Sequence, residues 1–278
     1  MKIEALLREG RELLKQQGSF SVNLDVRLLL QAAADLTHQE IVADPQSEVG
    51  VEATATFRSF IARRLGHEPV SRILGRREFY GRDFLITSDV LDPRPDTEVV
   101  VELALKYAKH GRFVDLGTGS GAIAVTLCAE AAAFHGVATD ISNPALQVAR
   151  GNAQRLGVAD RLRFHQGKWF DGLQGKFDLI ISNPPYIKTQ QSLPPDVADY
   201  DPHLALFAGD DGLMAYVDIA RQCATFLLPD GFVVLEIGHD QSTAVERLFE
   251  TEGFNLVDTA QDLGGHTRGL VFNLPKPR

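Results

Sequence analysis

Short apolar runs alternate with helical patterns from residue 112 to the end of the chain, and this alternation limits the possible folds more than any other feature. Helices are expected over residues 122–133, 143–157, 212–228 and 241–252, and a closing pair of strands over 254–258 and 270–274. Strands that alternate with helices form a parallel sheet covered on both faces, so the sequence predicts a doubly wound α/β domain. The five earlier strands are expected at Phe113–Leu116, Gly136–Asp140, Leu162–His165, Phe177–Ser182 and Phe232–Ile237.

The residues before this pattern divide into two further regions. Residues 1–66 carry apolar positions at helical spacing, which predicts three short amphipathic helices in a small N-terminal domain. Residues 67–92 contain short extended runs, among them Ile73-Leu74, separated by Gly75 and Gly81, and we interpret them as a linking β-hairpin. The third region, residues 93–278, is then the α/β domain.

The charge balance and the cysteines restrict the class of protein. The chain has 278 residues and a formal net charge of −9, which argues against direct, sequence-specific nucleic-acid binding by a basic surface. Cys128 and Cys223 both lie in apolar helical patterns, which indicates core residues in a reducing compartment. We see no signal peptide and no apolar run of the roughly 20 residues that span a membrane. We therefore expect a cytoplasmic protein, and nothing demands more than a monomer.

Arginines gather locally in this acidic chain. Six of them lie between residues 62 and 83, against three acidic residues. A solvated face is the more common explanation of such a run. A docking surface for an acidic or RNA-containing partner is the alternative.

A glycine-rich turn follows the first strand of the α/β domain. Gly117, Thr118, Gly119, Ser120 and Gly121 stand between that strand and the next helix, where glycines allow a tight turn and close approach of a ligand. Asp140 ends the second strand about 20 residues later, where an acid can accept hydrogen bonds from ribose hydroxyls or cap the following helix. This pattern is compatible with a dinucleotide or with S-adenosylmethionine.

The segment Asn183–Tyr186 favours S-adenosylmethionine, because a nicotinamide enzyme gains nothing from it. Pro184 and Pro185 have no N–H group and stop the preceding strand, so the chain leaves the sheet at the edge where such sheets bind ligands. The Asn183 side-chain oxygen and the Pro184 carbonyl can accept hydrogen bonds from a planar NH2 group, and Tyr186 can stack on it. Asp115, just before the glycine turn, is placed to meet a cationic amino group, although it could also brace the turn.

Three functions fit these residues. An amide nitrogen and the exocyclic amine of adenine (N6) or guanine (N2) are all planar and conjugated, so the chain could methylate a protein amide or a nucleic-acid base. A binding module without catalysis is the third possibility, although a pure binder needs no acceptors beside the methyl group. We find no metal-ligand spacing and no evident general base.

Several motifs along the chain resemble the HemK-type release-factor glutamine methyltransferases, the PrmC/HemK family. The resemblance implies N5-methylation of the glutamine in the Gly-Gly-Gln motif of class I peptide chain release factors, with S-adenosylmethionine as donor and S-adenosylhomocysteine as product. The motifs are Glu68-Pro69-Val70, Glu78-Phe79, Pro93-Arg94-Pro95-Asp96-Thr97-Glu98, Asp115–Gly121, Asn183–Tyr186 and Glu236-Ile237-Gly238 with Gln241.

The same resemblance assigns roles to individual residues. The cofactor site would be lined by Gly117–Gly121, Asp140, Trp169 and Asn183, and residues 183–186 would bind the glutamine. The N-terminal helical domain would help to hold the release factor. The expected fold is a Rossmann-like, seven-stranded class I S-adenosylmethionine methyltransferase domain, preceded by the small helical domain and the linking β-hairpin.

Two positions depart from the family pattern. Lys168 precedes Trp169-Phe170 where the family often has an acid, so Asp171 or a backbone carbonyl would contact the adenine amine instead. Asp201 stands in Tyr200-Asp201-Pro202 where glutamate is more common, a conservative change. Trp169, the single tryptophan, could also be a plain core residue.

Overall fold

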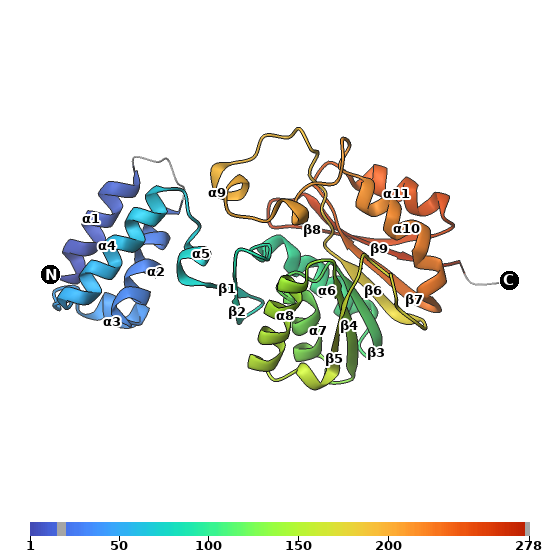
Figure 1. Ribbon diagram of the computed structural model, residues 1–278, viewed down its shortest axis with the longest axis horizontal. Helices are drawn as coiled ribbons and strands as arrows, with labels where there is room; N and C mark the ends of the chain where they lie inside the picture. Colours follow the sequence, from blue (N-terminus) through green and yellow to red (C-terminus); the bar gives the residue numbers. More distant parts are fainter. Residues whose placement is uncertain (16–20, 276–278) are drawn as a thin grey trace. The chain divides into compact units, whose positions relative to one another are not determined.

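The computed structural model describes residues 1–15 and 21–275, and the chain divides into two compact units (Figure 1). The first unit contains Met1–Arg76 together with Pro194–Tyr200, and the second contains Arg77–Leu193 and Asp201–Arg278. None of the described helices is long and apolar enough to cross a membrane.

The first unit is helical, as the sequence predicts, but its helices differ in number and extent. The helix α3 was not among the three predicted helices. It begins with a capping box in which Thr37 and Glu40 exchange hydrogen bonds. Ile73 and Leu74 belong to a helix and not to an extended run, because the helix begins after Pro69 and ends at Gly75, which has φ +68°. The helices are α1 (Ile3–Lys15), α2 (Val22–Ala34), α3 (His38–Ala43), α4 (Val51–Leu65) and α5 (Val70–Leu74).

A segment from much later in the chain completes the helical unit. Pro194–Tyr200 contains the short helix α9 (Pro195–Ala198). The Tyr200 hydroxyl donates a hydrogen bond to the Gly66 carbonyl oxygen at 2.8 Å, just after α4 ends. The chain therefore passes between the two units three times.

Within the described residues, seven strands of the second unit form one sheet in the order β5-β4-β3-β6-β7-β9-β8. Neighbours from β5 to β7 are parallel, and β9 is antiparallel to both β7 and β8. This confirms the predicted doubly wound sheet with its closing pair. The strands are β3 (Gly111–Leu116), β4 (Phe134–Asp140), β5 (Leu162–Gln166), β6 (Phe177–Ser182), β7 (Leu227–Glu236), β8 (Asn255–Gln261) and β9 (Thr267–Asn273).

Helices cover both faces of this sheet (Figure 1). Successive side chains of a strand point to opposite faces. Leu179 and Ile181 accordingly pack in one apolar cluster, with side chains of α6, α7 and α8, whereas Ile180 packs in another, with side chains of α10 and α11. The helices are α6 (Glu98–Tyr107), α7 (Ala122–Glu130), α8 (Asn143–Arg155), α10 (Met214–Phe226) and α11 (Ser242–Thr251), with 3₁₀ turns η1 (Pro95–Thr97), η2 (Ala159–Arg161) and η3 (His203–Ala205).

The linking hairpin is present, whereas one strand boundary depends on pairing with a distant strand. The predicted hairpin is a two-stranded sheet of β1 (Arg76–Phe79) and β2 (Arg82–Leu85). We predicted that a helix stops at Pro229 and that the next strand begins at Phe232. In the structure, β7 already begins at Leu227. Leu227 pairs with Phe177, and the pairing register then shifts before Leu179 and Phe232, which accommodates the proline.

Ion pairs engage much of the arginine run. Arg63 pairs with Glu68 and Arg64 with Asp25 in the helical unit. Arg82 pairs with Glu130 at 2.7 Å in the second unit. These guanidinium groups have acidic partners within their own unit. The ion pairs therefore favour the interpretation of the run as a structural face over its interpretation as a docking surface.

Candidate active site

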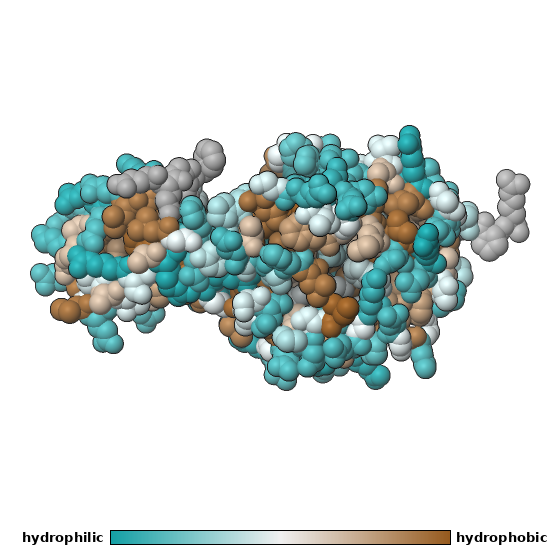
Figure 2. Space-filling model, turned by 45° about the horizontal axis from the view of Figure 1, so that its top comes forward, coloured by the Kyte–Doolittle hydropathy of each residue, from teal (hydrophilic) through white to brown (hydrophobic). Residues whose placement is uncertain are grey.

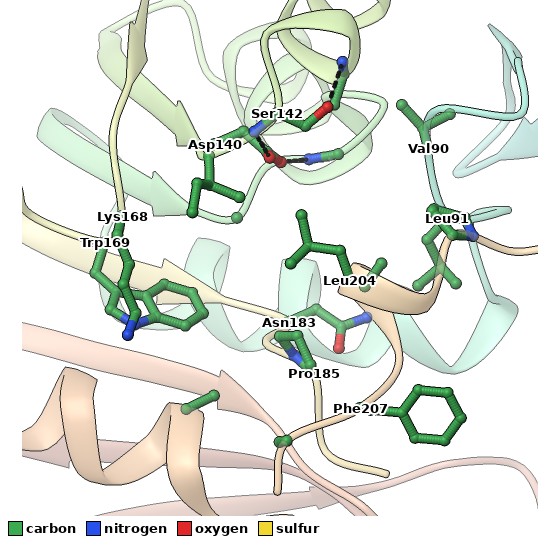
Figure 3. A pocket seen from close by; sticks show the side chains of 18 of the residues that line it. Val90, Leu91, Asp140, Ser142, Lys168, Trp169, Asn183, Pro185, Leu204 and Phe207 are labelled. Carbon is green, nitrogen blue, oxygen red and sulfur yellow. Dashed lines mark hydrogen bonds between the residues drawn. The ribbon is translucent and has the colours of Figure 1, made fainter. Parts of the chain in front are cut away.

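A cavity of about 390 Å³ lies in the α/β unit, beside the carboxyl ends of β3, β4 and β6 (Figure 3). These strands are neighbours in the sheet, so the segments that follow them meet at one edge. Figure 2 shows apolar surface, in brown, interrupting the polar coat of this larger unit. The lining residues are Asp89, Val90, Leu91, Gly117, Gly119, Asp140, Ile141, Ser142, Ala145, Gly167, Lys168, Trp169, Asn183, Pro185, Pro202, Leu204, Ala205, Phe207, Ala208, Met214, Ala215 and Asp218.

The glycine turn supplies backbone to one wall of the cavity. Gly117, Gly119 and Gly121 have φ values of +72°, +53° and +81°, which side chains rarely allow. A Cβ atom on Gly121 would lie 3.1 Å from the Ala149 Cβ, so this glycine also permits close approach of α8. Gly117 and Gly119 line the cavity, whereas Thr118, Ser120 and Gly121 do not. The turn thus fits the role of holding a ligand through its backbone.

Asp115 lies fully buried in β3, next to last in the strand. Its Oδ2 accepts a hydrogen bond from the Thr118 hydroxyl at 2.5 Å, and Oδ1 has no hydrogen-bond partner among the described residues. Burial raises the pKa of Asp115 to about 7, against the effects of the Thr118 hydroxyl and the Ala124 backbone amide. A buried carboxylate with an unpaired oxygen is costly, so the residue suits a cationic group arriving with a ligand.

Asp140 ends β4 and joins the glycine turn to the next loop. Its Oδ2 accepts from the Gly119 amide at 2.9 Å, and its Oδ1 accepts from the Ser142 amide at 2.9 Å (Figure 3). Burial raises the pKa of Asp140, and these backbone hydrogen bonds oppose the rise. The helix cap is Ser142, whose hydroxyl accepts from the Ala145 amide, so Asp140 does not cap α8. The carboxylate faces the cavity with lone pairs free for further donors.

Trp169 and Lys168 form another part of the wall (Figure 3). Trp169 has φ +52°, an uncommon conformation for a bulky residue and one that is often retained at functional sites. The Lys168 Nζ lies 2.7 Å from the Asp218 Oδ2 of α10. Asp171, which the sequence analysis considered for the adenine amine, is not part of the lining, whereas Asp218 is. The acid at this wall therefore comes from a helix 50 residues later in the chain.

The segment Asn183–Tyr186 leaves the end of β6 and is held from several sides. Asn183 and Pro185 line the cavity, whereas Pro184 and Tyr186 do not. The Tyr186 carbonyl oxygen accepts a hydrogen bond from the Gln241 Nε2 at 3.0 Å, and Gln241 also binds the Gly212 carbonyl and the Gly238 amide. Burial raises the pKa of the Tyr186 hydroxyl to about 12, so this group stays protonated near neutral pH. The segment is thus a fixed part of the site.

An apolar wall stands beside Asn183, and the sequence analysis missed it. It consists of Val90, Leu91, Leu204 and Phe207, which come from two distant segments and are drawn above or to the right of Asn183 in Figure 3. Leu204 is 61% exposed. Its sequence signal was weak, because single apolar residues in loops are common.

Comparisons with known proteins place the chain among methyltransferases. Residues 5–75 match the family model described as the PrmC N-terminal domain, and residues 90–199 match the methyltransferase small domain. A release factor glutamine methyltransferase of Agrobacterium fabrum is 40% identical, covering 97% of this chain and 96% of its own. One of Caulobacter vibrioides is 43% identical, covering 96% of this chain and 94% of its own.

A solved structure supports the fold alone. A methyltransferase from Pyrococcus furiosus is 20% identical and covers 70% of this chain and 89% of its own, with a TM-score of 0.53. The residues that line the cavity lie within the part of the chain that matches the methyltransferase family model, apart from Asp89 and those after residue 199.

Proposed function

The chain belongs to the family of release factor glutamine methyltransferases, and from that premise we propose that it methylates the side-chain amide nitrogen (N5) of the glutamine in the Gly-Gly-Gln motif of class I peptide chain release factors. S-adenosylmethionine is the donor and S-adenosylhomocysteine the product. The single observation that carries this proposal is Asn183, whose amide lines the cavity while its nitrogen is already engaged by Thr97. Its oxygen is left as an acceptor for a substrate NH2 group.

An amide nitrogen needs acceptors because its lone pair is delocalised into the carbonyl group. Hydrogen bonds from its two N–H bonds to the Asn183 Oδ1 and the Pro184 carbonyl strengthen as positive charge develops on the attacking nitrogen. Such bonds stabilise the transition state more than the ground state. Tyr186 does not accept the proton, because its hydroxyl stays protonated, and its ring is proposed to stack on the planar amide.

The residues around the cavity fit S-adenosylmethionine, which when bound supplies a methyl group activated on a sulfonium. Asp115 is fully buried and lies outside the cavity lining, and its unpaired oxygen is proposed to bind the amino group of the methionine part. Asp140 would accept from the ribose hydroxyls, and the turn Gly117–Gly121, with Trp169 and Asn183, is proposed to form the rest of the cofactor site. Of that turn, Gly117 and Gly119 line the cavity. No three His, Cys, Asp or Glu residues gather as metal ligands would in the part of the chain that the structure describes.

The helical unit is proposed to help hold the release factor. Residues 5–75, which match the PrmC N-terminal domain, make up most of it. Release factors act at the ribosome, so the proposed place of action is the cytoplasm. The proposed active species is a monomer, since the residues assigned to the reaction all come from one chain.

The direct test is mass spectrometry of a purified release factor after incubation with the protein and isotopically labelled S-adenosylmethionine. One labelled methyl group on the glutamine of the Gly-Gly-Gln motif is expected, and none on a release factor in which that glutamine is replaced by alanine. Methylation of adenine or guanine in an oligonucleotide, with no label on the release factor, would overturn the proposal in favour of a nucleic-acid methyltransferase. Cofactor binding without turnover on any of these substrates would indicate a binding module.

A further inference from the structure

A short chain of hydrogen bonds lies behind Asn183, on the side away from the proposed substrate. The Asn183 Nδ2 donates to the Thr97 hydroxyl oxygen at 3.1 Å. Thr97, 4% exposed, lies where η1 meets α6, 86 residues earlier in the sequence. The Thr97 hydroxyl is also close enough to Glu236, the last residue of β7, to act on that carboxyl as a hydrogen-bond donor that lowers its pKa. Three segments that are far apart in sequence thus meet behind Asn183.

The direction of these hydrogen bonds decides what Asn183 can do. The two ends of a primary amide have almost the same shape, but one end only accepts hydrogen bonds and the other only donates. A substrate NH2 group needs the accepting end. A hydroxyl has a single hydrogen, so when Thr97 gives it to a carboxylate, its oxygen is left to accept from the Asn183 nitrogen. The Asn183 oxygen is then the end left for the substrate.

Glu236 is placed to set this direction. Its side chain is buried, with 1% of the residue exposed, and Oε2 has no hydrogen-bond partner among the described residues. An ionised carboxylate can only accept, whereas a protonated one can donate to Thr97 and leave the Thr97 hydrogen free to turn toward Asn183. The charged or titratable groups that act on Glu236 are Arg94, Asp96, Arg268, Tyr186 and Tyr216, from four different segments.

We propose that Thr97 and Glu236 are positioning residues for the methyl transfer, which hold the Asn183 amide with its oxygen toward the substrate nitrogen. Neither residue lines the cavity, and Thr97 accepts a hydrogen bond from Asn183, so both are placed to act through Asn183. The inference rests on the proposed function, because it assigns them a part in that reaction.

The first experiment compares Thr97→Val, which removes the hydroxyl at nearly constant shape, with Thr97→Ser, which keeps it. With the release factor as substrate at saturating S-adenosylmethionine, kcat of Thr97→Val is expected to fall about 10- to 100-fold, by analogy with losing a hydrogen-bond partner that orients a metal ligand. KM and the Kd of S-adenosylhomocysteine, measured by calorimetry, should stay within about twofold, and Thr97→Ser should restore most of kcat. A Thr97→Val variant with the kcat of the unmodified protein would overturn the inference.

Thr126→Val is the matched control. Thr126 is a fully buried threonine of α7 whose hydroxyl has no hydrogen-bond partner among the described residues, and it is outside the cavity lining. This variant should retain full kcat. An equal loss of kcat in Thr126→Val and Thr97→Val would mean a general effect of removing a buried hydroxyl and would overturn the inference. If the unmodified protein does not methylate the release factor, the proposed function itself fails, which is a different result.

Glu236→Gln gives an independent measurement that does not depend on how Thr97→Val folds. Burial raises the pKa of Glu236 to about 7, so kcat of the unmodified protein should decrease as the pH falls through that region. Glu236→Gln has no such titration, and its kcat should be lower at pH 8 and nearly constant down to pH 6. Saturating S-adenosylmethionine keeps cofactor binding out of this comparison. A variant that retains both the full kcat at pH 8 and the decrease toward acid would overturn the role of Glu236.

Discussion

The backbone amide of Gly119 donates a hydrogen bond to the Asp140 carboxylate at 2.9 Å, and this bond joins the glycine turn after β3 to the end of β4. Two features that the sequence suggests separately are therefore one unit of structure. The same carboxylate holds the Ser142 amide, so the loop that starts α8 is fixed along with the turn. A change at Asp140 would alter the shape of the cavity wall as well as its charge.

Replacing Asn183 tests the centre of the proposed chemistry. Asn183→Ala is expected to lower kcat about 10²- to 10³-fold, as for loss of one preorganised polar group in an active site. The Kd of S-adenosylhomocysteine should change much less, which calorimetry can check. Asn255→Ala, at an exposed position of β8, is the control and should be fully active. Near-normal turnover of Asn183→Ala would contradict the assignment.

The pKa of Asp115 predicts how the stability of the cofactor-free protein depends on pH. Its pKa is raised from 3.8 to about 7 in the folded protein, so its contribution to stability is present below pH 4 and is lost as the pH rises through 7. Asp115→Asn should therefore increase the free energy of unfolding at pH 8, by at most about 1.4 kcal/mol for each pKa unit, and the gain should shrink toward pH 5. Denaturant unfolding at both pH values measures this.

The same variant should behave in the opposite way toward the cofactor. If Asp115 binds a cationic amino group, Asp115→Asn weakens S-adenosylhomocysteine binding at pH 8 even though it stabilises the cofactor-free fold. Unchanged affinity, measured by calorimetry at pH 8, would show that Asp115 only braces the turn.

The Lys168–Asp218 pair predicts unequal effects on cofactor affinity. Asp218→Asn should raise the Kd of S-adenosylhomocysteine about tenfold if the carboxylate accepts from the adenine amine, the cost of losing a hydrogen bond to a charged group. Lys168→Ala should change the Kd less, and neither should alter stability much, since the side chains are 52% and 31% exposed and such pairs contribute about 0–1 kcal/mol. A larger effect from Lys168→Ala would reverse the assignment.

Two variants of Tyr186 distinguish a role of its ring in stacking from a role of its hydroxyl in proton transfer. The hydroxyl pKa of about 12 excludes it as a base near pH 7, so Tyr186→Phe should keep kcat within about twofold. Tyr186→Ala should raise KM for the release factor up to about tenfold, the scale of one aromatic contact. Melting temperatures should be measured with both, because the ring is largely buried. A large loss of kcat in Tyr186→Phe would contradict this prediction.

The alternation of strands and helices in the sheet domain could be predicted from the sequence, because local patterns carry it. Alternating apolar runs and helices placed β3, β4 and β6, and with them the glycine turn and Asn183, at one edge. Elements whose limits depend on distant partners were less predictable. The strand β7 extends back to Leu227 only because Phe177 pairs with it.

The side chains that support the site were harder to infer for the same reason. Thr97 and Glu236 stand in motifs that the resemblance singled out, but only folding brings them together behind Asn183. The place of Asp218 in the cavity wall could not be predicted from the sequence, because its approach to Lys168 requires α10 to pack beside the loop after β5. Contacts between side chains from separate elements follow from packing, and a single sequence records packing only as hydrophobic periodicity.

The thrice-crossing path of the chain has a practical consequence for dissecting this enzyme. Removal of residues 1–76 would take away Gly66, the hydrogen-bond partner of Tyr200. Residues 194–200 would then lack the helical unit that they complete. That stretch runs straight into Pro202 and Leu204 of the cavity wall. Loss of turnover in such a truncated enzyme could therefore come from a disturbed cavity wall in the α/β unit as well as from lost substrate binding by the helical unit.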